Sequence, residues 1–312
     1  MKINYKIKLL ILCMGLLIIS KMSFAQEDTT VVSEEVTEAV TEDEGKLPVR
    51  SPWNASMIID NQTTEGPNAK SFEMTIHHRF GKIEDISNLF GIYAASNIRL
   101  GINYGVTDKI SIGFGTEKDH KMQEFQGKYK IISQTRDGKI PISVTYFGSA
   151  VIDSRDEEVF GIDYKFLDRL SFLNQIIVSR KVTDAFSVQF ALSYSHFNSV
   201  TETTKNAKGD TIGLWKNDVA GIMLGGRYKI HNNISAIIEY CQPININKAW
   251  EGQNEPKPNL GIGVEFGTST HAFQVFAAQY ASIVAQQNYA RNFASIGDIN
   301  DWRIGFNITV RF

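Results

Sequence analysis

From Phe72 onward, hydrophobic and polar residues alternate with a period of two. The clearest alternating stretches are 72–80, 97–106, 186–195, 259–266 and 302–312. Because successive side chains of a β-strand point to opposite faces, this pattern predicts strands with one apolar and one polar face. No stretch after residue 25 shows a sustained period of 3.6 residues. The chain is therefore expected to be all-β.

A recurring turn suggests how these strands are connected. In residues 106–112, 182–188 and 230–236, a strand ends, a few polar residues including Asp or Asn follow, and a new alternating strand begins. Asp and Asn favour such turns because their side chains bond to nearby backbone groups. Longer polar stretches separate the remaining strands, so short and long connections alternate along the chain.

The spacing of the turns predicts about 12 strands. They are expected near 71–80, 97–106, 110–116, 124–133, 140–150, 168–182, 186–199, 215–230, 234–246, 259–267, 271–281 and 301–312. An even strand number, with short turns at one end and long loops at the other, is typical of outer-membrane barrels. The prediction is an antiparallel up-and-down transmembrane β-barrel in the outer membrane, with the short turns in the periplasm.

The last strand carries the most specific signal. Trp302, Phe306 and Phe312 lie on its apolar phase, and the chain ends at Phe312. The ten residues between Trp302 and Phe312 span roughly 25 Å along a tilted strand, the height of a lipid-facing band between aromatic girdles. This pattern resembles the C-terminal signal read by Gram-negative barrel-assembly machinery. Outer-membrane lipid and that machinery are therefore expected partners.

The first 50 residues differ from the rest. Residues 1–25 combine a basic start, an apolar run and Ser23-Phe24-Ala25, which predicts a secretory signal peptide. Residues 26–50 hold eight acids against Lys46 and Arg50 and contain no aromatic residue. Such a composition predicts an acidic, disordered leader. Residues 51–312 are expected to form the outer-membrane β-barrel domain.

Composition and charge exclude several classes of protein. The 312 residues carry 32 Lys or Arg and 34 Asp or Glu, a net charge of −2, which gives no basic footprint for nucleic acid. Only Cys241 remains after residue 25, so no disulfide scaffold can form. Adjacent His77 and His78 point to opposite faces of one strand, and no histidine has a ligand at metal-site spacing. No cofactor or metal is expected.

The polar phase of the strands, assigned to the lumen, is rich in bases. These lumen-facing candidates are Arg79, Arg99, Lys128, Lys130, Arg169, Lys181, Arg227, Lys229, Arg303 and Arg311. The acids on the same phase are Glu73, Glu239 and Glu265. An excess of Arg and Lys along a pore favours anions. A plugged interior, in which these charges pair with one another, with loops or with the leader, is the alternative.

Little in the sequence suggests catalysis. No phosphate-binding glycine loop joins a strand to a helix. Ser195 and His196 are the one local pair that could serve a lipid hydrolase, but neighbours on a strand face opposite ways, beyond the reach that a nucleophile and its base require. The chain is therefore expected not to be an enzyme.

Five segments resemble an uncharacterised family of single-domain outer-membrane β-barrels from Bacteroidota, a domain of unknown function. They are Ser51–Ser56, Ile76–Gly81, Asn97–Asp108, Lys128–Gln134 and Pro141–Gly148. The resemblance covers about residues 50–312. It implies the fold and the membrane location, and it implies no catalytic residue or ligand.

These patterns favour a barrel that gives passive passage to small solutes, with a weak preference for anions. A sealed structural or docking barrel, whose acidic leader recruits a basic partner or plugs the pore, is the second hypothesis. An outer-membrane lipid hydrolase is the third.

Overall fold

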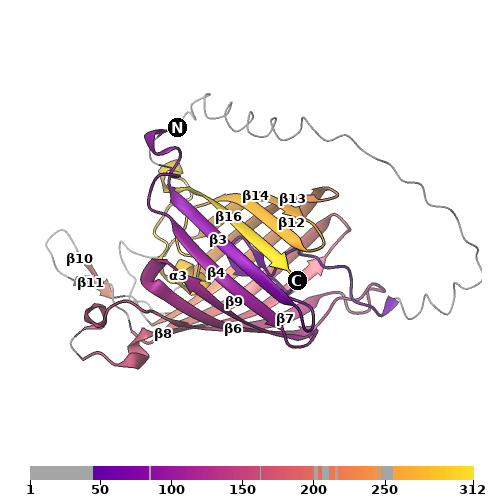
Figure 1. Ribbon diagram of the computed structural model, residues 1–312, viewed down its shortest axis with the longest axis horizontal. Coiled ribbons are helices and arrows are strands. Elements are labelled where there is room, and N and C mark those ends of the chain that lie inside the picture. The colour runs from indigo at the N-terminus through magenta and orange to yellow at the C-terminus, as the bar shows by residue number, and fades with distance from the viewer. Residues whose placement is uncertain are drawn as a thin grey trace, which may run out of the picture. The chain divides into compact units, whose positions relative to one another are not determined.

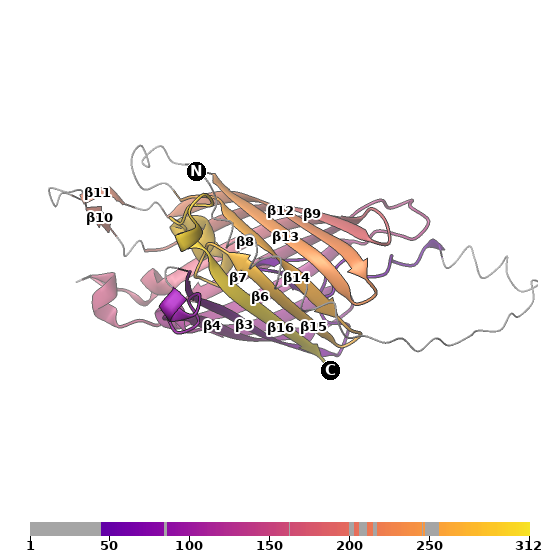
Figure 2. The same ribbon diagram turned by 90° about the horizontal axis from the view of Figure 1, so that it is seen from above.

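The computed structural model describes residues 45–83, 86–161, 163–199, 203–205, 211–214, 217–244, 246 and 256–312. Antiparallel strands form one closed barrel (Figures 1 and 2), and β16 pairs with β3 to close it. The 12 wall strands are β3 (Phe72–Lys82), β4 (Asn97–Gly105), β5 (Ile110–Glu117), β6 (Met122–Ile132), β7 (Ser143–Ile152), β8 (Leu170–Lys181), β9 (Phe186–Phe197), β12 (Asp218–His231), β13 (Ile234–Ile244), β14 (Asn259–Gly267), β15 (His271–Ala278) and β16 (Arg303–Arg311). The predicted 12-stranded antiparallel barrel is confirmed.

The strands begin and end within three residues of the predicted bounds. The short turns and the C-terminus lie at one end of the barrel, here called the turn end. The longer connections lie at the opposite end, called the loop end. Both the indigo residues that follow position 44 and the C-terminus lie at the turn end (Figure 1).

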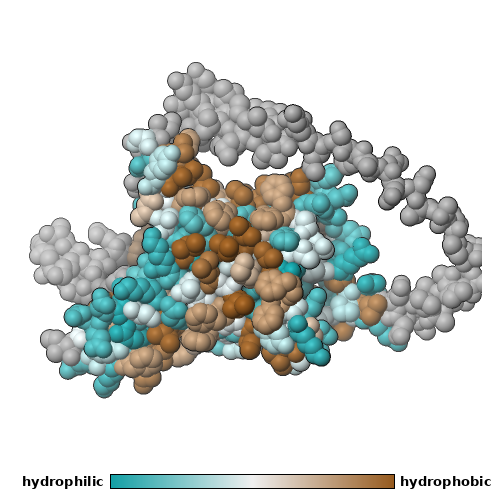
Figure 3. Space-filling view, in the orientation of Figure 1, coloured by the Kyte–Doolittle hydropathy of each residue, from teal (hydrophilic) through white to brown (hydrophobic). Residues whose placement is uncertain are grey.

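The outer face of the wall is apolar. Large aliphatic and aromatic side chains on one phase of each strand are exposed, among them Leu100, Ile112, Phe125, Leu192 and Val275. Figure 3 shows hydrophobic residues gathered across the middle of the wall and hydrophilic residues toward both ends. An apolar belt of this kind is what a barrel presents to lipid. The opposite phase of the same strands is buried inside the barrel.

In the turns at 106–112 and 182–188, a threonine hydroxyl caps the turn in place of the Asp side chain that the sequence pattern pointed to. The Thr107 hydroxyl accepts hydrogen bonds from the backbone N–H groups of Lys109 and Ile110, at 3.2 and 3.0 Å. Thr183 does the same for Ala185 and Phe186, at 3.2 and 3.0 Å. A hydroxyl that satisfies two backbone donors closes the turn as an Asx turn would.

Smaller elements accompany the wall. They are the hairpin β1 (Met57–Ile58) and β2 (Asn61–Gln62), the hairpin β10 (Thr203–Lys205) and β11 (Thr211–Leu214), the helix α3 (Ala285–Arg291), and 3₁₀ helices at Ile86–Asn88, Asp119–Lys121, Glu157–Phe160, Phe166–Arg169 and Ile299–Asp301. Among the described residues, no helix is long and apolar enough to cross a membrane. The β1–β2 hairpin and α3 lie inside the barrel and determine what the lumen can do.

Candidate functional site

An N-terminal plug, residues 53–64, occupies the lumen. It contains the β1–β2 hairpin, in which Met57 pairs with Gln62 and Ile58 with Asn61. Every residue of the plug except Asn54 is buried. Since so short a hairpin is not stable on its own, contacts with the barrel wall must hold it in place.

Charged wall side chains hold the backbone of the plug. The Glu239 carboxylate accepts hydrogen bonds from the backbone N–H groups of Asp60 and Asn61, at 3.2 and 3.0 Å. Lys128 donates from the other side, to the carbonyl oxygens of Ser56, Thr63 and Glu65 at 3.2, 2.9 and 2.5 Å. Hydrogen bonds to charged groups are about twice as strong as those between neutral ones. The wall therefore supplies the partners that the hairpin lacks.

A buried ion pair fixes the tip of the hairpin. Arg79 on β3 pairs with Asp60 and donates a second hydrogen bond to the Ile59 carbonyl, at 3.1 Å. The Arg79 guanidinium also lies over the Phe276 ring, 4.3 Å from its centroid. Both charges of the pair are fully buried, so each depends on the other for compensation.

The lumen is not wholly polar, which corrects the expectation of a polar interior. An apolar cluster joins the plug to one side of the wall. Trp53, Ile58 and Ile59 of the plug belong to it. The large wall side chains in the cluster are Phe147, Leu173, Ile177, Phe197, Met223, Ile237 and Phe276. Burying each such side chain contributes about 1.5–3 kcal/mol, so this side of the plug packs as a protein core does.

A loop insert, residues 279–292, fills the lumen from the loop end. It includes α3, which packs against β8, β12 and β13. One wall carboxylate holds its backbone: Glu117 on β5 accepts from the N–H groups of Ile283 and Val284 at 2.8 and 3.1 Å. The loop between β15 and β16 therefore folds inward, which the pattern of residues did not predict.

The two inserts meet inside the barrel. The Tyr289 hydroxyl of the loop insert donates to the Asn61 side chain of the plug at 3.0 Å and accepts from Ser193 on β9 at 3.1 Å. Gly221 makes room for the Tyr289 ring, because a Cβ there would lie 2.4 Å from a ring carbon. The gap between Ser56 of the plug and the wall residues Asn103 and Phe147 measures about 10 Å³, at the limit of what one water needs. The plug and the loop insert together close the lumen.

Five of the predicted lumen bases point into the barrel, and each has a partner there. Arg79 pairs with Asp60 and Lys128 binds plug carbonyls, as described above. The other three pair with wall carboxylates: Arg99 with Glu124 at 2.6 Å, Arg227 with Glu265 at 2.8 Å and Arg311 with Glu73 at 2.9 Å. Compensation by pairing was the alternative left open by the sequence.

The remaining predicted bases lie at or beyond the ends of the barrel. Lys130 pairs with Glu65 at 3.6 Å and Lys181 with Asp184 at 3.0 Å, both at the turn end. Arg303 lines a loop-end cavity of about 310 Å³. Arg169 lies in a 3₁₀ helix outside the strands and stacks on Phe160 and Tyr164. Lys229 lies at the turn end, in the cavity described below.

Sequence reasoning missed three interior acids, Glu117, Glu124 and Asp60, and a fourth at the turn end, Glu65. Glu117 and Glu124 follow the inward phase of β5 and β6, so a more exact assignment of these two strands could have found them. Asp60 and Glu65 belong to the N-terminal segment, which has no alternation of its own. Nothing in the sequence indicates that this segment enters the barrel.

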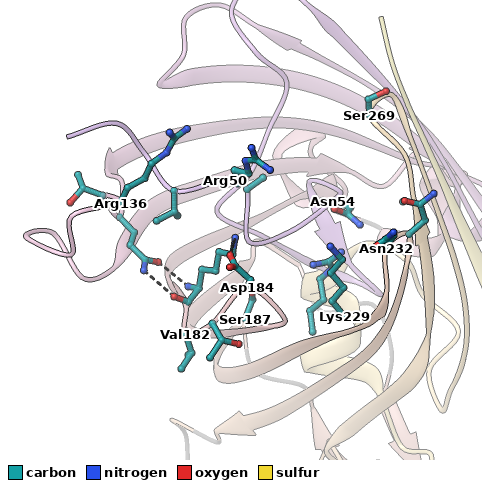
Figure 4. A pocket seen from close by; sticks show the side chains of 18 of the residues that line it. Arg50, Asn54, Arg136, Val182, Asp184, Ser187, Lys229, Asn232 and Ser269 are labelled. Carbon is teal, nitrogen blue, oxygen red and sulfur yellow. Dashed lines mark hydrogen bonds and ion pairs between the residues drawn. The ribbon is translucent and has the colours of Figure 1, made fainter. Parts of the chain in front are cut away.

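A basic vestibule, a cavity of about 1000 Å³, opens at the turn end. Five cationic side chains line it, and one carboxylate. The cations are Arg50, Arg136, Lys181, Arg227 and Lys229, and the acid is Asp184. Figure 4 shows Arg50, Arg136 and Lys229 reaching the cavity from three separate segments. The vestibule thus has a strong local excess of positive charge in a barrel domain whose charges balance overall.

The negative charge of Asp184, the single acid of the vestibule, is compensated by its ion pair with Lys181. The hydrogen bond from Lys181 and the charge of Lys181 lower the pKa of Asp184, and the nearby charges of Lys229 and Arg50 act in the same direction. By contrast, the side chains of Arg50 and Lys229 form no ion pair with any residue that the structure describes. A cavity with unpaired cations attracts anions.

A strap, residues 45–52, forms one border of the vestibule. Its backbone pairs with the β6–β7 turn: the N–H of Val49 donates to the Gln134 carbonyl at 2.9 Å, and the N–H of Arg136 to the Leu47 carbonyl at 3.0 Å. On its other side lies a second turn-end cavity of about 740 Å³. The strap therefore divides the opening and fixes where the chain enters the lumen.

Ser195 and His196 lie on opposite faces of β9. Ser195 is fully buried inside the barrel. The His196 ring nitrogen Nδ1 instead lies 2.7 Å from an Asp218 carboxylate oxygen on the outer face, where Tyr194 also contacts Asp218. The two side chains are thus held apart, whereas a nucleophile and its base must lie within hydrogen-bond reach of each other.

The three aromatic residues of the predicted assembly signal are spread along the last strand. Trp302 precedes β16 at the loop end, and Phe306 stacks on the His78 ring at 5.0 Å on the outer face. Phe312 lies at the turn end, where its backbone exchanges two hydrogen bonds with Phe72, at 2.8 and 3.0 Å. Its side chain is 66% exposed.

Comparison with known protein families identifies the whole barrel and plug. Residues 53–312 match the family described as membrane bound beta barrel domain (DUF5777). A comparison with curated proteins finds no match.

Several solved structures are similar in fold. An outer membrane channel from Pseudomonas putida F1 (COG4313) aligns with a TM-score of 0.48 and 10% identity, over 80% of this chain and 97% of that one. The KdgM porin aligns with a TM-score of 0.41 and 10% identity, over 78% and 98%. The same porin in complex with disordered oligogalacturonate gives 0.42 and 9%, over 78% and 98%.

Proposed function

The chain belongs to the membrane bound beta barrel domain family, DUF5777, and on that premise we propose that it is an outer-membrane pore closed at rest by its own N-terminal plug. When the plug is displaced, the lumen gives passive passage to small solutes with a weak preference for anions. In this proposal residues 1–25 are a signal peptide. The acidic leader and the turn end face the periplasm of a Gram-negative cell of the Bacteroidota, and the loop end faces outward.

The observation that carries the proposal is the way the plug is held. Wall side chains, Lys128 and Glu239 among them, bind its backbone groups directly. Water can replace each of these hydrogen bonds when the plug leaves, so a typical bond contributes only about 0.5–1.5 kcal/mol net. A displaced plug would leave a polar wall that water can fill.

Displacement of the plug would also change the charge of the lumen. Asp60 would leave with the plug, and Arg79 would lose its buried partner. Lys128 would lose the carbonyl oxygens that now surround its ammonium group. Arg99, Arg227 and Arg311 would keep their wall carboxylates. Because only a few cations become unpaired, we expect a weak anion preference rather than a strong one.

A sealed docking barrel is the second candidate, and the apolar cluster favours it. Trp53, Ile58 and Ile59 pack against the wall as in a permanent core. In that case the acidic leader of residues 26–50 would recruit a basic partner while the lumen stays closed.

Single-channel recording separates the two candidates. Residues 26–312 and a variant lacking residues 26–64 would be refolded in a planar bilayer under a salt gradient. We expect the first protein to be silent and the second to give discrete steps with an anion-selective reversal potential. A variant lacking only residues 26–44 retains the plug and should also be silent.

Because the deletion variant could misfold, a substitution in the protein of residues 26–312 provides a second test. Ile58→Asp places a carboxylate in the apolar cluster, where burial of an unpaired charge is costly, and should expel the plug. A folded barrel that remains silent in both variants would overturn the pore and support the docking barrel. Steps with cation selectivity would keep the pore and overturn the anion preference.

We propose that Trp302, Phe306 and Phe312 guide assembly into the membrane. The exposed position of Phe312 supports this role, since a recognition residue must be accessible. Deletion of Phe312 should lower the amount of heat-modifiable, folded barrel in the outer membrane. Unchanged assembly would contradict the role.

We propose no enzymatic activity. The lipid hydrolase hypothesis can be tested directly. If it holds, Ser195→Ala and His196→Ala would each abolish hydrolysis of a phospholipid by the refolded barrel. Hydrolysis that is absent from the parent protein, or unchanged in both variants, counts against it.

A further inference from the structure

The basic vestibule is built from parts of the chain that are far apart in sequence. Arg50 comes from the strap, Arg136 from the β6–β7 turn, and Lys229 from the end of β12. Like charges brought together in this way repel one another unless an anion lies between them. Only Lys181 and Arg227 have carboxylate partners, so the cavity retains unpaired positive charge.

The rest of the lining indicates what kind of anion fits. Side-chain amides and hydroxyls surround the cations, from Asn54, Gln134, Asn232, Asn233, Ser51, Thr135, Thr183, Ser187, Thr268 and Ser269. Among the described residues, the side chains of Asn232, Asn233, Thr183, Ser187 and Ser269 donate to no protein acceptor and can hydrogen-bond to oxygen atoms of a ligand. The described lining residues include no aromatic side chain. A nucleobase or a stacked sugar ring would therefore find no platform there, whereas a compact polyanion would find both charges and donors.

The size of the cavity agrees with a small solute. Its volume of about 1000 Å³ lies at the upper end of the range for small-molecule sites. The strap borders one side, and Asn54 of the plug and the buried Ser187 line the cavity (Figure 4), so the cavity reaches the start of the plug.

We infer that the basic vestibule binds a small solute with two or more negative charges, carried by phosphate or carboxylate groups. This inference specifies the class of solute for the proposed pore, and its biological role rests on that proposal. The binding of the anion does not depend on the proposed pore, because the vestibule is formed while the plug is in place.

One contact connects the site to the plug. Arg227 on the vestibule wall holds Glu265 at 2.8 Å, and the same carboxylate oxygen accepts a hydrogen bond from the Asn54 amide at 2.9 Å. Asn54 itself lines the vestibule. An anion that draws Arg227 away would take a cation from Glu265 and disturb the contact that positions the start of the plug.

Calorimetric titration of the refolded, plugged protein tests the site. The probes are tripolyphosphate and citrate, which separate phosphate from carboxylate recognition, with chloride as the monovalent comparison. We expect one of the two polyanions, or both, to bind with one-to-one stoichiometry. The double variant Arg50→Gln with Lys229→Gln should weaken that binding about tenfold, since it removes two of the three vestibule cations that have no carboxylate partner among the described residues.

A matched control removes the same charge elsewhere at the turn end. Lys70→Gln with Lys109→Gln lies outside the vestibule and should change the dissociation constant by less than about twofold, because exposed charges at a distance are screened by salt. Equal losses in the two double variants, or no binding of either polyanion, would overturn the site. Binding of poly-glutamate alone would also overturn it and assign the surface to an acidic protein.

The outcomes remain distinct from those of the proposed pore. If the barrel is silent but binds polyanions at the vestibule, this inference holds and the proposed pore is wrong. If the barrel conducts but binds neither probe, the proposed pore holds and this inference is wrong.

Discussion

The two inserts that close the lumen are held in different ways. The N-terminal plug is bound through its backbone by side chains from several strands, including Arg79, Lys128 and Glu239. The backbone of the loop insert is bound by one carboxylate, that of Glu117, and by the neutral amides of Asn97 and Asn259. The backbone of the plug is thus held mainly by charged side chains, and that of the loop insert largely by neutral ones.

Their attachment to the wall differs in the opposite sense. The loop insert is continuous with β15 at one end and with β16 at the other. The plug continues into β3 on one side only, and on the other it leaves the lumen through the strap at the turn end. A segment that is joined to the wall at one end can withdraw as a unit. A loop that is joined to the wall at both ends loses little conformational entropy when it stays in the lumen. The plug therefore needs the stronger contacts, and it is the one suited to act as a gate.

Removal of Glu239 should weaken the plug most. Glu239→Ala would leave the backbone donors of Asp60 and Asn61 and the Tyr280 hydroxyl without their acceptor. Leaving several buried donors unpaired costs about 3 kcal/mol or more. Cys241 lies buried beneath the plug and is the only cysteine after residue 25. Its rate of labelling by a thiol reagent should rise by about two orders of magnitude.

Glu124→Ala is the matched control for this variant. It breaks a buried ion pair with Arg99 that joins two wall strands and does not involve the plug. The barrel should lose stability to urea, while labelling of Cys241 under native conditions stays near the parent rate. Equal acceleration in both variants would mean that the plug and the wall open together, and the distinction between them would disappear.

The sequence predicted the wall of the barrel but not the plug, and the reason is physical. A wall strand has lipid on one side and the interior on the other, so its residues alternate and its period can be read locally. The plug is buried on all sides and is fixed by partners such as Glu239, about 180 residues away in the chain. Residues 53–64 therefore carry no periodic signal of their own.

The charges of the lumen illustrate the same limit. The inward bases follow from strand phase, and Arg79, Arg99 and Arg227 do point inward. Their partners were not predicted, because Asp60 belongs to the plug and Glu124, on the same phase as Lys128, was not counted among the inward acids. Counting bases on one phase thus overstated the free positive charge of the lumen. It could not show that the unpaired cations gather at the turn end.

Removal of Glu117 should loosen the loop insert with a smaller effect. Glu117→Ala deprives the N–H groups of Ile283 and Val284 of their acceptor. The loss is about 1–2 kcal/mol, and labelling of Cys241 should rise about tenfold. Because the plug remains, a planar bilayer should still show no current. Discrete current steps in this variant would make the loop insert, and not the plug, the gate.

The smallest expected effect concerns the contact between the inserts. Tyr289→Phe removes the hydroxyl that donates to Asn61 and accepts from Ser193. One hydrogen bond of this kind contributes about 1 kcal/mol, so labelling of Cys241 should rise roughly fivefold. Tyr146→Phe, which removes a hydroxyl bonded to Asn174 on the outer face, should leave the rate unchanged.

A double-mutant cycle with Asn61→Ala then measures whether the two inserts support each other. If the Tyr289–Asn61 contact couples them, the effects of the two substitutions should fall short of additivity by about 0.5–1 kcal/mol. Strict additivity would mean that the plug and the loop insert close the lumen independently. In that case the plug could open without any response at the loop end, and the loop insert would be a fixed part of the wall.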